Sequence, residues 1–440
     1  MTNRKNTART DPPGIRSNGR LVSCLLALTG LTLVPAAASA GDWTSKDGYI
    51  YYSTPSAPAQ DQRIDLKDKA NTPSFVLMGG GPDVDQAFRW MIERAGVRPA
   101  SAGKPATGGR FVIVRARGDD GYNPYIYYSN ASLQTDQPAA DDWVGGAQLG
   151  LSSVETLVIP NRAAANSDFV NQVVRSANAV FIAGGDQSDY IRDWKRTKLE
   201  ASLLELMKNQ VPIGGTSAGL AVMGQFDFAA LRGTVTSTQA LADPYNKYMT
   251  LDPVPLTLTQ YAPDNAATEG AGFLTPAPLF NIVFDSHLDS RDRLGRLVTF
   301  VARQIGGGAW GDGCPGGILN PGMAPKPSQT DLYARGIGLS VETALLVAPN
   351  GNGQLIAQRV TNANNQDSAS KAFFVSTSQA PSQCAAGLPL SIPAVDIVQA
   401  DANAPAFNLS TWSGGSRQDK LEVKDGVMSP AGITFYSDPP

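Results

Sequence analysis

A serine between glycines constrains the fold of this chain more than any other feature. The stretch Val211–Phe226 reads VPIGGTSAGLAVMGQF, and Ser217 lies within it in the pattern G-x-S-x-G. Apolar residues before the glycines indicate the end of a buried strand, and small or apolar residues after them favour the first turns of a helix. Such a strand-to-helix turn is typical of serine nucleophiles, because glycines tolerate its crowded backbone and the hydroxyl projects outward. A glycine turn without a catalytic role fits the same pattern.

Strand-like apolar runs alternate with helical patterns on both sides of this serine. This alternation predicts an α/β fold, in which a parallel sheet carries helices on both faces. In such sheets, sites lie beyond the carboxyl ends of the strands. The glycine turns at Gly79–Gly81 and Gly184–Gln187 follow predicted strands, as Ser217 does. We therefore expect the three turns to converge on one crevice.

His287 is the only histidine of the chain, and it follows a predicted strand at residues 281–284. A serine hydroxyl needs a base near neutral pH, and imidazole is the usual one. We predict that His287 is the general base for Ser217, although a lone histidine also fits a structural role. The backbone N–H groups of Ala218 and Gly80 are predicted to bind the oxyanion. A tight turn without that role is the alternative for the glycines.

The first 40 residues predict a secretory signal peptide. Basic residues precede the apolar run of residues 21–34, and Ala38-Ser39-Ala40 follows it. Cleavage is expected after Ala40. A membrane anchor is less favoured, because the run is shorter than the roughly 20 residues that span a bilayer. The mature chain is expected to be secreted or periplasmic.

Composition limits the partners and cofactors of the chain. A net charge of −3 over 440 residues argues against nucleic acid as a general partner. After cleavage only Cys314 and Cys384 remain, and either a disulfide or two buried thiols fits them. Two cysteines and one histidine so far apart do not suit a metal site, and no cofactor is expected.

The texture of the sequence changes near residue 350. Residues 41–350 are expected to form the α/β domain. Short β-like runs with polar spacers then predict an antiparallel β accessory segment over residues 351–440. Covering a sheet edge, supporting a homodimer and binding a polymer are all open roles for this segment.

Four motifs of the chain occur in a fixed order: GGDQ at residues 184–187, GGTSAGLAVM at 214–223, FDSHLDSRDRLGRL at 284–297 and GIGLSVETALLV at 336–347. Together they resemble those of the cyanophycinases, serine peptidases related to aspartyl dipeptidase. The resemblance implies a flavodoxin-like α/β fold and a serine nucleophile. It also implies exo-cleavage of multi-L-arginyl-poly-L-aspartate to β-Asp-Arg dipeptides, and a signal peptide points to the secreted members.

The resemblance also assigns roles to individual residues. It implies that Ser217 is the nucleophile and His287 the base. Arginines suit the free carboxylates of the polymer backbone, while carboxylates and amides suit its guanidinium groups. A solvated helix face is the alternative for the arginines. The implied substrate-pocket residues are Gln187, Asp285, Arg293 and Arg296.

The third catalytic member departs from the family pattern. Glu342 is expected to orient the histidine, but it is displaced by one position from the acid of the family motif. On a strand, this shift turns the side chain to the opposite face unless a bulge restores it. Asp285 and Asp289 are the alternative acids. Ser286 also stands where the family commonly has glutamine, so substrate contacts there are open.

Two other function classes fit parts of the sequence. A secreted esterase would share the serine turn, but its acid should precede the histidine in the chain. A non-catalytic polymer-binding protein on a decayed peptidase scaffold would explain the displaced Glu342.

Overall fold

The structure is a computed structural model that describes residues 43–56, 63–129, 143–253, 271–307, 313–322, 333–362, 365 and 370–429. All of them belong to the compact unit Ser39–Pro440. The predicted signal peptide and its cleavage after Ala40 lie outside the described residues. None of the helices in the described ranges has both the length and the apolar character that a membrane crossing requires.

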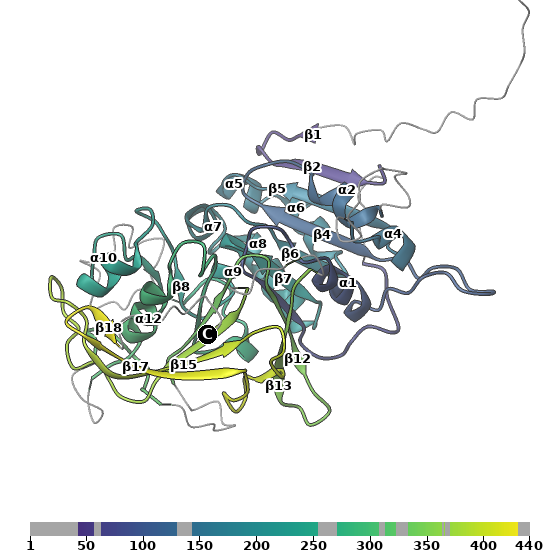
Figure 1. The fold of residues 1–440 in the computed structure, drawn as a ribbon. Helices are drawn as coiled ribbons and strands as arrows, with labels where there is room; N and C mark the ends of the chain where they lie inside the picture. The colour runs from purple at the N-terminus through teal and green to yellow at the C-terminus, as the bar shows by residue number, and fades with distance from the viewer. Residues whose placement is uncertain are drawn as a thin grey trace, which may run out of the picture. The chain divides into compact units, whose positions relative to one another are not determined.

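Ten strands of the described residues form one mixed sheet (Figure 1). Its centre is parallel and runs β5-β4-β6-β7-β3, and antiparallel strands flank it on both sides. In sheet order, the strands are β1 (Trp43–Thr44), β2 (Ile50–Thr54), β5 (Ser153–Val158), β4 (Arg110–Arg115), β6 (Ala179–Ile182), β7 (Ile213–Thr216), β3 (Phe75–Met78), β12 (Ala344–Pro349), β13 (Leu355–Val360) and β16 (Phe407–Asn408).

Helices cover both faces of the parallel part of this sheet. Side chains alternate between the faces of a strand, so Val76 and Met78 pack into one apolar cluster while Phe75 and Leu77 pack into another. The predicted α/β class with helices on both faces is therefore confirmed. The first cluster includes α1 (Asp85–Arg94), α2 (Tyr122–Tyr127) and α4 (Gly146–Leu149), and the second includes α5 (Arg162–Ala165), α6 (Asp168–Arg175), α7 (Gln187–Asp193), α8 (Lys198–Lys208) and α9 (Ala218–Ala221).

A second sheet of six described strands carries the histidine-bearing segment. Only β10 and β11 are parallel in it, and the other neighbours are antiparallel. Its apolar cluster includes α10 (Ser237–Ala242) and α12 (Leu294–Arg303). The strands are β10 (Ile282–Asp285), β11 (Arg335–Leu339), β14 (Ala372–Thr377), β15 (Ile392–Ala400), β17 (Arg417–Lys424) and β18 (Val427–Ser429).

Smaller elements complete this region. The short strands β8 (Asp227–Phe228) and β9 (Leu251–Asp252) pair with each other, and a 3₁₀ turn covers Ala277–Leu279. Cys314 and Cys384 form a disulfide, with their Cα atoms 5.0 Å apart. Of the two outcomes that the sequence leaves open for these cysteines, the structure therefore shows the bonded one.

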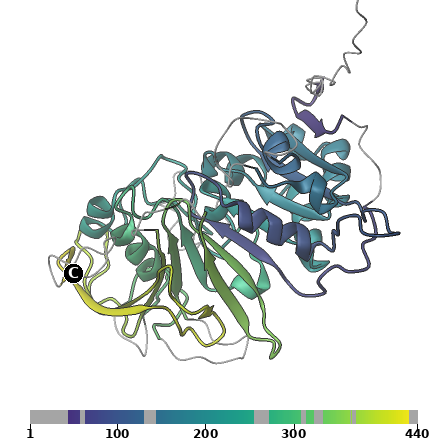
Figure 2. The same ribbon diagram turned by 45° about the vertical axis from the view of Figure 1, so that its right-hand side comes forward.

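The C-terminal strands extend both sheets. In the described part of residues 351–429, β13 and β16 join the first sheet, while β14, β15, β17 and β18 join the second; this part of the chain has the yellow-green to yellow colours of Figure 2. The predicted β-rich character of this segment is confirmed, and the domain boundary at residue 350 stays a prediction. Short alternating strands give no local signal of their partners, because strand pairing here joins residues far apart in the chain.

Candidate active site

Ser217 lies on a strained turn between β7 and α9. Its backbone has φ 52° and ψ −113°, a conformation that a residue other than glycine adopts only when its surroundings enforce it. The neighbouring glycines make this possible. A Cβ atom on Gly219 would lie 2.1 Å from the carbonyl oxygen of Ile182, and one on Gly215 would lie 2.4 Å from that of Gly219. The sequence pattern thus folds as the expected sharp turn.

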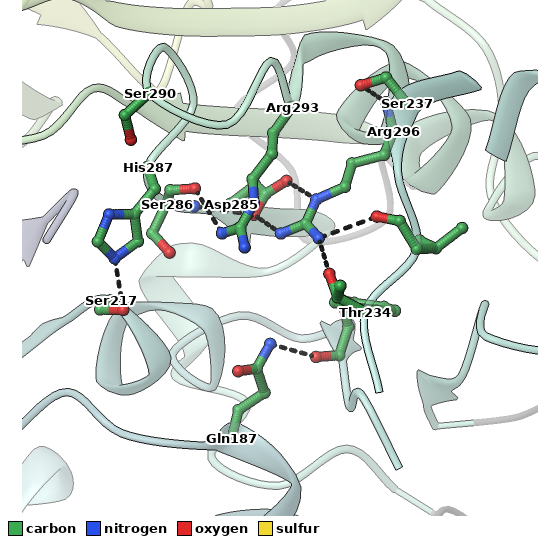
Figure 3. A network of polar contacts seen from close by, with 12 residues as sticks. Gln187, Ser217, Thr234, Ser237, Asp285, Ser286, His287, Ser290, Arg293 and Arg296 are labelled. Atoms are coloured by element: carbon green, nitrogen blue, oxygen red, sulfur yellow. Dashed lines mark hydrogen bonds and ion pairs between the residues drawn. The ribbon is translucent and has the colours of Figure 1, made fainter. Parts of the chain in front are cut away.

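His287 meets this serine from the end of β10. Its Nε2 lies 2.9 Å from Ser217 Oγ, within hydrogen-bonding distance (Figure 3). The backbone of His287 has φ 50°, and its N–H donates to the carbonyl of Gly79 at 2.8 Å. The predicted contact between the serine and the histidine is therefore observed. The first glycine turn holds the backbone of His287 through the Gly79 carbonyl.

The imidazole is held in its neutral form. Burial is the main cause that lowers the pKa of His287 from 6.5 to about 4, and the positive charges of Arg291 and Arg293 lower it further. A neutral imidazole can accept a proton, whereas an imidazolium cannot. At neutral pH, His287 is therefore ready to act as a base.

The two predicted oxyanion donors come from the two turns at this pair, Ala218 from the serine turn and Gly80 from the first glycine turn. Ala218 begins α9, and the first N–H groups of a helix have no intrahelical acceptor. Gly80 lies against the imidazole, because a Cβ atom there would be 2.5 Å from His287 Nε2. The carbonyl of Gly80 accepts the backbone N–H of Glu342 at 2.8 Å, which fixes the orientation of the turn. The oxyanion role of both N–H groups stays a prediction.

Glu342 does not orient the histidine in this structure. Its Oε1 accepts a hydrogen bond from Asn362 at 3.1 Å, and among the described residues no hydrogen bond joins it to His287. Glu342 lies in the turn between β11 and β12 with φ 51°, so its side-chain direction follows the turn and not strand alternation. The substitute Asp289 accepts the N–H groups of Val341 and Ser290. Neither acid contacts the imidazole.

Asp285 and Arg296 form a buried ion pair. Arg296 Nε and Nη2 donate to the two carboxylate oxygens at 2.7 and 2.6 Å, and the residues are 2% and 1% exposed (Figure 3). Thr234 also accepts from Arg296 Nη1 at 2.8 Å. The two charges are therefore matched inside the protein, and the predicted substrate-binding roles of Asp285 and Arg296 stay predictions.

Arg293 lies next to this pair and is partly exposed. Its Nη1 donates to the carbonyl of Ser286 at 2.9 Å and lies 3.8 Å from Asp285 Oδ1. Its side chain is 12% exposed. Burial lowers the pKa of Arg293 to about 10, so the guanidinium is still cationic at neutral pH. Its predicted contact with a substrate carboxylate stays a prediction.

Gln187 begins α7 on the opposite side of the serine turn. Its Nε2 donates to the carbonyl of Phe228 at 3.2 Å, and its side-chain oxygen points away from that bond (Figure 3). The amide is thus anchored at one end and offers an acceptor at the other. Its predicted contact with a substrate guanidinium stays a prediction.

Sequence reasoning missed two groups of polar residues. Thr234 and Ser237 hold Arg296, but they come from a region that looked like a loop and carries no motif. Asp83 follows the first glycine turn, and its Oδ2 accepts the hydroxyl of Tyr122 at 2.6 Å. A carboxylate directly after a glycine turn was the available signal for Asp83. Within the described ranges, no group of three or more His, Cys, Asp or Glu residues is placed to hold a metal ion.

Part of this chain is similar to known peptidases. Residues 144–250, which contain Gln187 and Ser217, match the model of Peptidase family S51. Cyanophycinases of Trichormus variabilis and Nostoc sp. are each 26% identical over 156 residues. These alignments cover 35% of this chain and 43% of each relative. The chain thus matches less than half the length of the curated relatives.

The chain is also similar to solved structures, among them two peptidases. A peptidase from an acI-B1 Actinobacterium shows a TM-score of 0.34 and 15% identity, covering 67% of this chain and 97% of that one. A putative Peptidase E protein of Listeria monocytogenes shows a TM-score of 0.32 and 12% identity, covering 66% and 100%. These scores are too low to carry an argument.

Proposed function

Because this chain is a cyanophycinase-like member of peptidase family S51, we propose that it is a secreted serine-type exopeptidase that hydrolyses cyanophycin to β-Asp-Arg dipeptides. The single observation that carries the proposal is the 2.9 Å contact between Ser217 Oγ and His287 Nε2 on a strained strand-to-helix turn. The secreted location rests on the signal-peptide pattern of the first 40 residues.

The chemistry proceeds by acyl transfer. His287 Nε2 takes the proton of Ser217 as Oγ attacks the aspartyl carbonyl, and the N–H groups of Ala218 and Gly80 bind the developing oxyanion. The imidazolium then protonates the leaving amine, which leaves an acyl-enzyme. Water, activated by the same imidazole, attacks the acyl carbon and releases Ser217.

Recognition of the polymer uses the groups that the protein leaves available. Arg293 is suited to a free carboxylate of the polyaspartate backbone, since guanidinium and carboxylate bond strongly when they lie parallel. The side-chain oxygen of Gln187 accepts from the guanidinium of the substrate arginine. The buried pair of Asp285 and Arg296 does not touch substrate in this proposal. Its carboxylate attracts the Arg293 guanidinium, 3.8 Å away, and so helps to position it.

The test is hydrolysis by the purified chain and by its Ser217→Ala variant. Both are incubated with cyanophycin, an Asp-X dipeptide and a p-nitrophenyl ester, and products are separated by chromatography. We expect the wild type alone to release dipeptides from the polymer. Ester turnover without polymer cleavage would favour the esterase. Polymer binding without any turnover would favour the non-catalytic protein.

A further control addresses the third catalytic member. Glu342→Gln keeps the size and the hydrogen bonding of the side chain but removes its charge. Because Asn362 and not His287 contacts this carboxylate, we expect the variant to keep most of its activity. Asp65→Asn, a change at an exposed carboxylate, is the matched control.

A further inference from the structure

The carboxyl group of Asp83 lies where the first glycine turn meets the serine turn. Asp83 follows Gly81 by two residues, and its Oδ2 accepts the hydroxyl of Tyr122 at 2.6 Å. On its other side the carboxyl faces the hydroxyl of Thr216, the residue directly before Ser217. The Asp83 side chain therefore links the glycine turn that contains Gly80 to the turn that contains Ser217.

Two polar atoms at this joint are buried without a partner. Asp83 Oδ1 and Thr216 Oγ1 are both inaccessible to solvent, and neither makes a hydrogen bond of ordinary geometry with any described residue. A buried polar atom without a hydrogen bond is destabilising, so each such atom needs an explanation. These two belong to facing groups, and a small movement of either turn would let the Thr216 hydroxyl donate to the carboxylate.

We propose that Asp83 is a positioning residue, which sets the distance between the oxyanion turn and the nucleophile turn through Thr216, and that its charged form is the state in which Ser217 reacts. The inference deepens the proposed function and rests on Ser217 as the nucleophile. Hydrogen bonds in resting active sites are often long and tighten only when substrate binds. Closure of the contact between Asp83 and Thr216 is such a step.

The surroundings of Asp83 let its charge change in a useful pH range. Burial is the main cause that raises its pKa to about 6, and Asp85 raises it as well, whereas Tyr122, Thr216 and Arg115 lower it. Tyr125 donates to Asp85, and Asn362 links the Asp83 carbonyl to the Glu342 carboxylate. Above about pH 6 the carboxylate can accept the Thr216 hydroxyl, and below it a proton occupies the carboxyl.

The first measurement is the pH dependence of Ser217 modification by a sulfonyl fluoride, which needs a reactive serine but no particular substrate. We expect the modification rate to increase in two steps as pH rises, one near pH 4 as His287 loses its proton and one near pH 6 as Asp83 does. Asp83→Asn should remove the rise near pH 6, and Thr216→Val should slow modification at least about tenfold. Thr216→Ser, which keeps the hydroxyl, should restore most of the rate.

The second measurement uses the only histidine of the chain as a probe. In protein labelled with ¹⁵N-histidine, the His287 signals should shift with a midpoint near pH 6, and the shift should vanish in Asp83→Asn but persist in Asp65→Asn. A residue that only supports the fold would lower the rate equally at every pH and leave this midpoint in place. The unfolding transition of each variant shows whether it is folded.

The outcomes separate this inference from the proposed function. Modification of Ser217 without polymer hydrolysis refutes the substrate and leaves the role of Asp83 standing. If the wild type does not react with the reagent, the proposed function fails and the NMR titration alone decides. The inference is overturned if the wild type shows no increase of the modification rate near pH 6. It is also overturned if that increase persists in Asp83→Asn.

Discussion

Replacing Gly80 by alanine should lower kcat/KM far more than its modest effect on stability explains. Gly80 has φ 94°, and a Cβ atom there would lie 2.5 Å from His287 Nε2, although ordinary contact begins at 3.4 Å. The imidazole must therefore move by about 0.9 Å. A misplacement of about 1 Å costs about 10²-fold in rate, equal to about 2.7 kcal/mol of barrier. The expected loss in kcat/KM is of that size.

A second glycine separates this contact from backbone strain. Gly353 has φ 75° in the turn between β12 and β13, and a Cβ atom there meets nothing within 4 Å. Both alanine variants carry the cost of a left-handed residue, about 1–2 kcal/mol. The free energy of unfolding, measured by denaturant titration, should therefore decrease by a similar amount in both variants. The rates of hydrolysis and of Ser217 modification should decrease only in Gly80→Ala. Equal activity of the two variants would refute the assumption that the imidazole, and not the turn, gives way.

Three further predictions follow from the buried groups. Arg296→Met removes the buried partner that donates to both Asp285 oxygens and leaves only Arg293, 3.8 Å away. The free energy of unfolding should therefore drop by about 3–5 kcal/mol in denaturant titration, and a drop below about 1 kcal/mol would contradict the pair's burial. Cys384→Ala removes the bond to Cys314, which closes 70 residues, and should cost about 4 kcal/mol in the same assay; no difference from the wild type would count against a formed disulfide. Because the pKa of His287 falls from 6.5 to about 4 on folding, the unfolded chain binds the proton first, so stability should decrease as pH falls from about 6.5 to about 4. His287→Gln should lack that part of the pH dependence, and an unchanged profile would contradict the shift.

The sequence was most informative where a local pattern repeats in the structure. The alternation of apolar runs with helical patterns predicted β3, β4, β5, β6, β7 and β10, because a parallel sheet needs strands that are apolar on both faces. The chemistry of a serine that needs a base, in a chain with one histidine, predicted that Ser217 and His287 meet, and they do so although β7 and β10 belong to different sheets. Both predictions depended on short stretches of chain.

The rest depended on contacts between distant segments. Motifs gave the residue types of Asp285 and Arg296 but not their burial, to which Thr234 and Ser237 contribute from elsewhere in the chain. Glu342 was interpreted as a strand residue, but β11 ends at Leu339, so the alternation rule did not apply to it. The partners of the C-terminal strands were likewise not encoded near those strands.

The serine and the histidine are carried by different sheets, since β7 belongs to the ten-stranded sheet and β10 to the six-stranded one. Neither sheet alone contains both residues, so the pair of Ser217 and His287 forms only when both sheets have folded. β10 borders β11, which in turn pairs with β14 from the last quarter of the chain. A newly synthesised chain should thus complete the surroundings of His287 only after β14 (Ala372–Thr377) has been added.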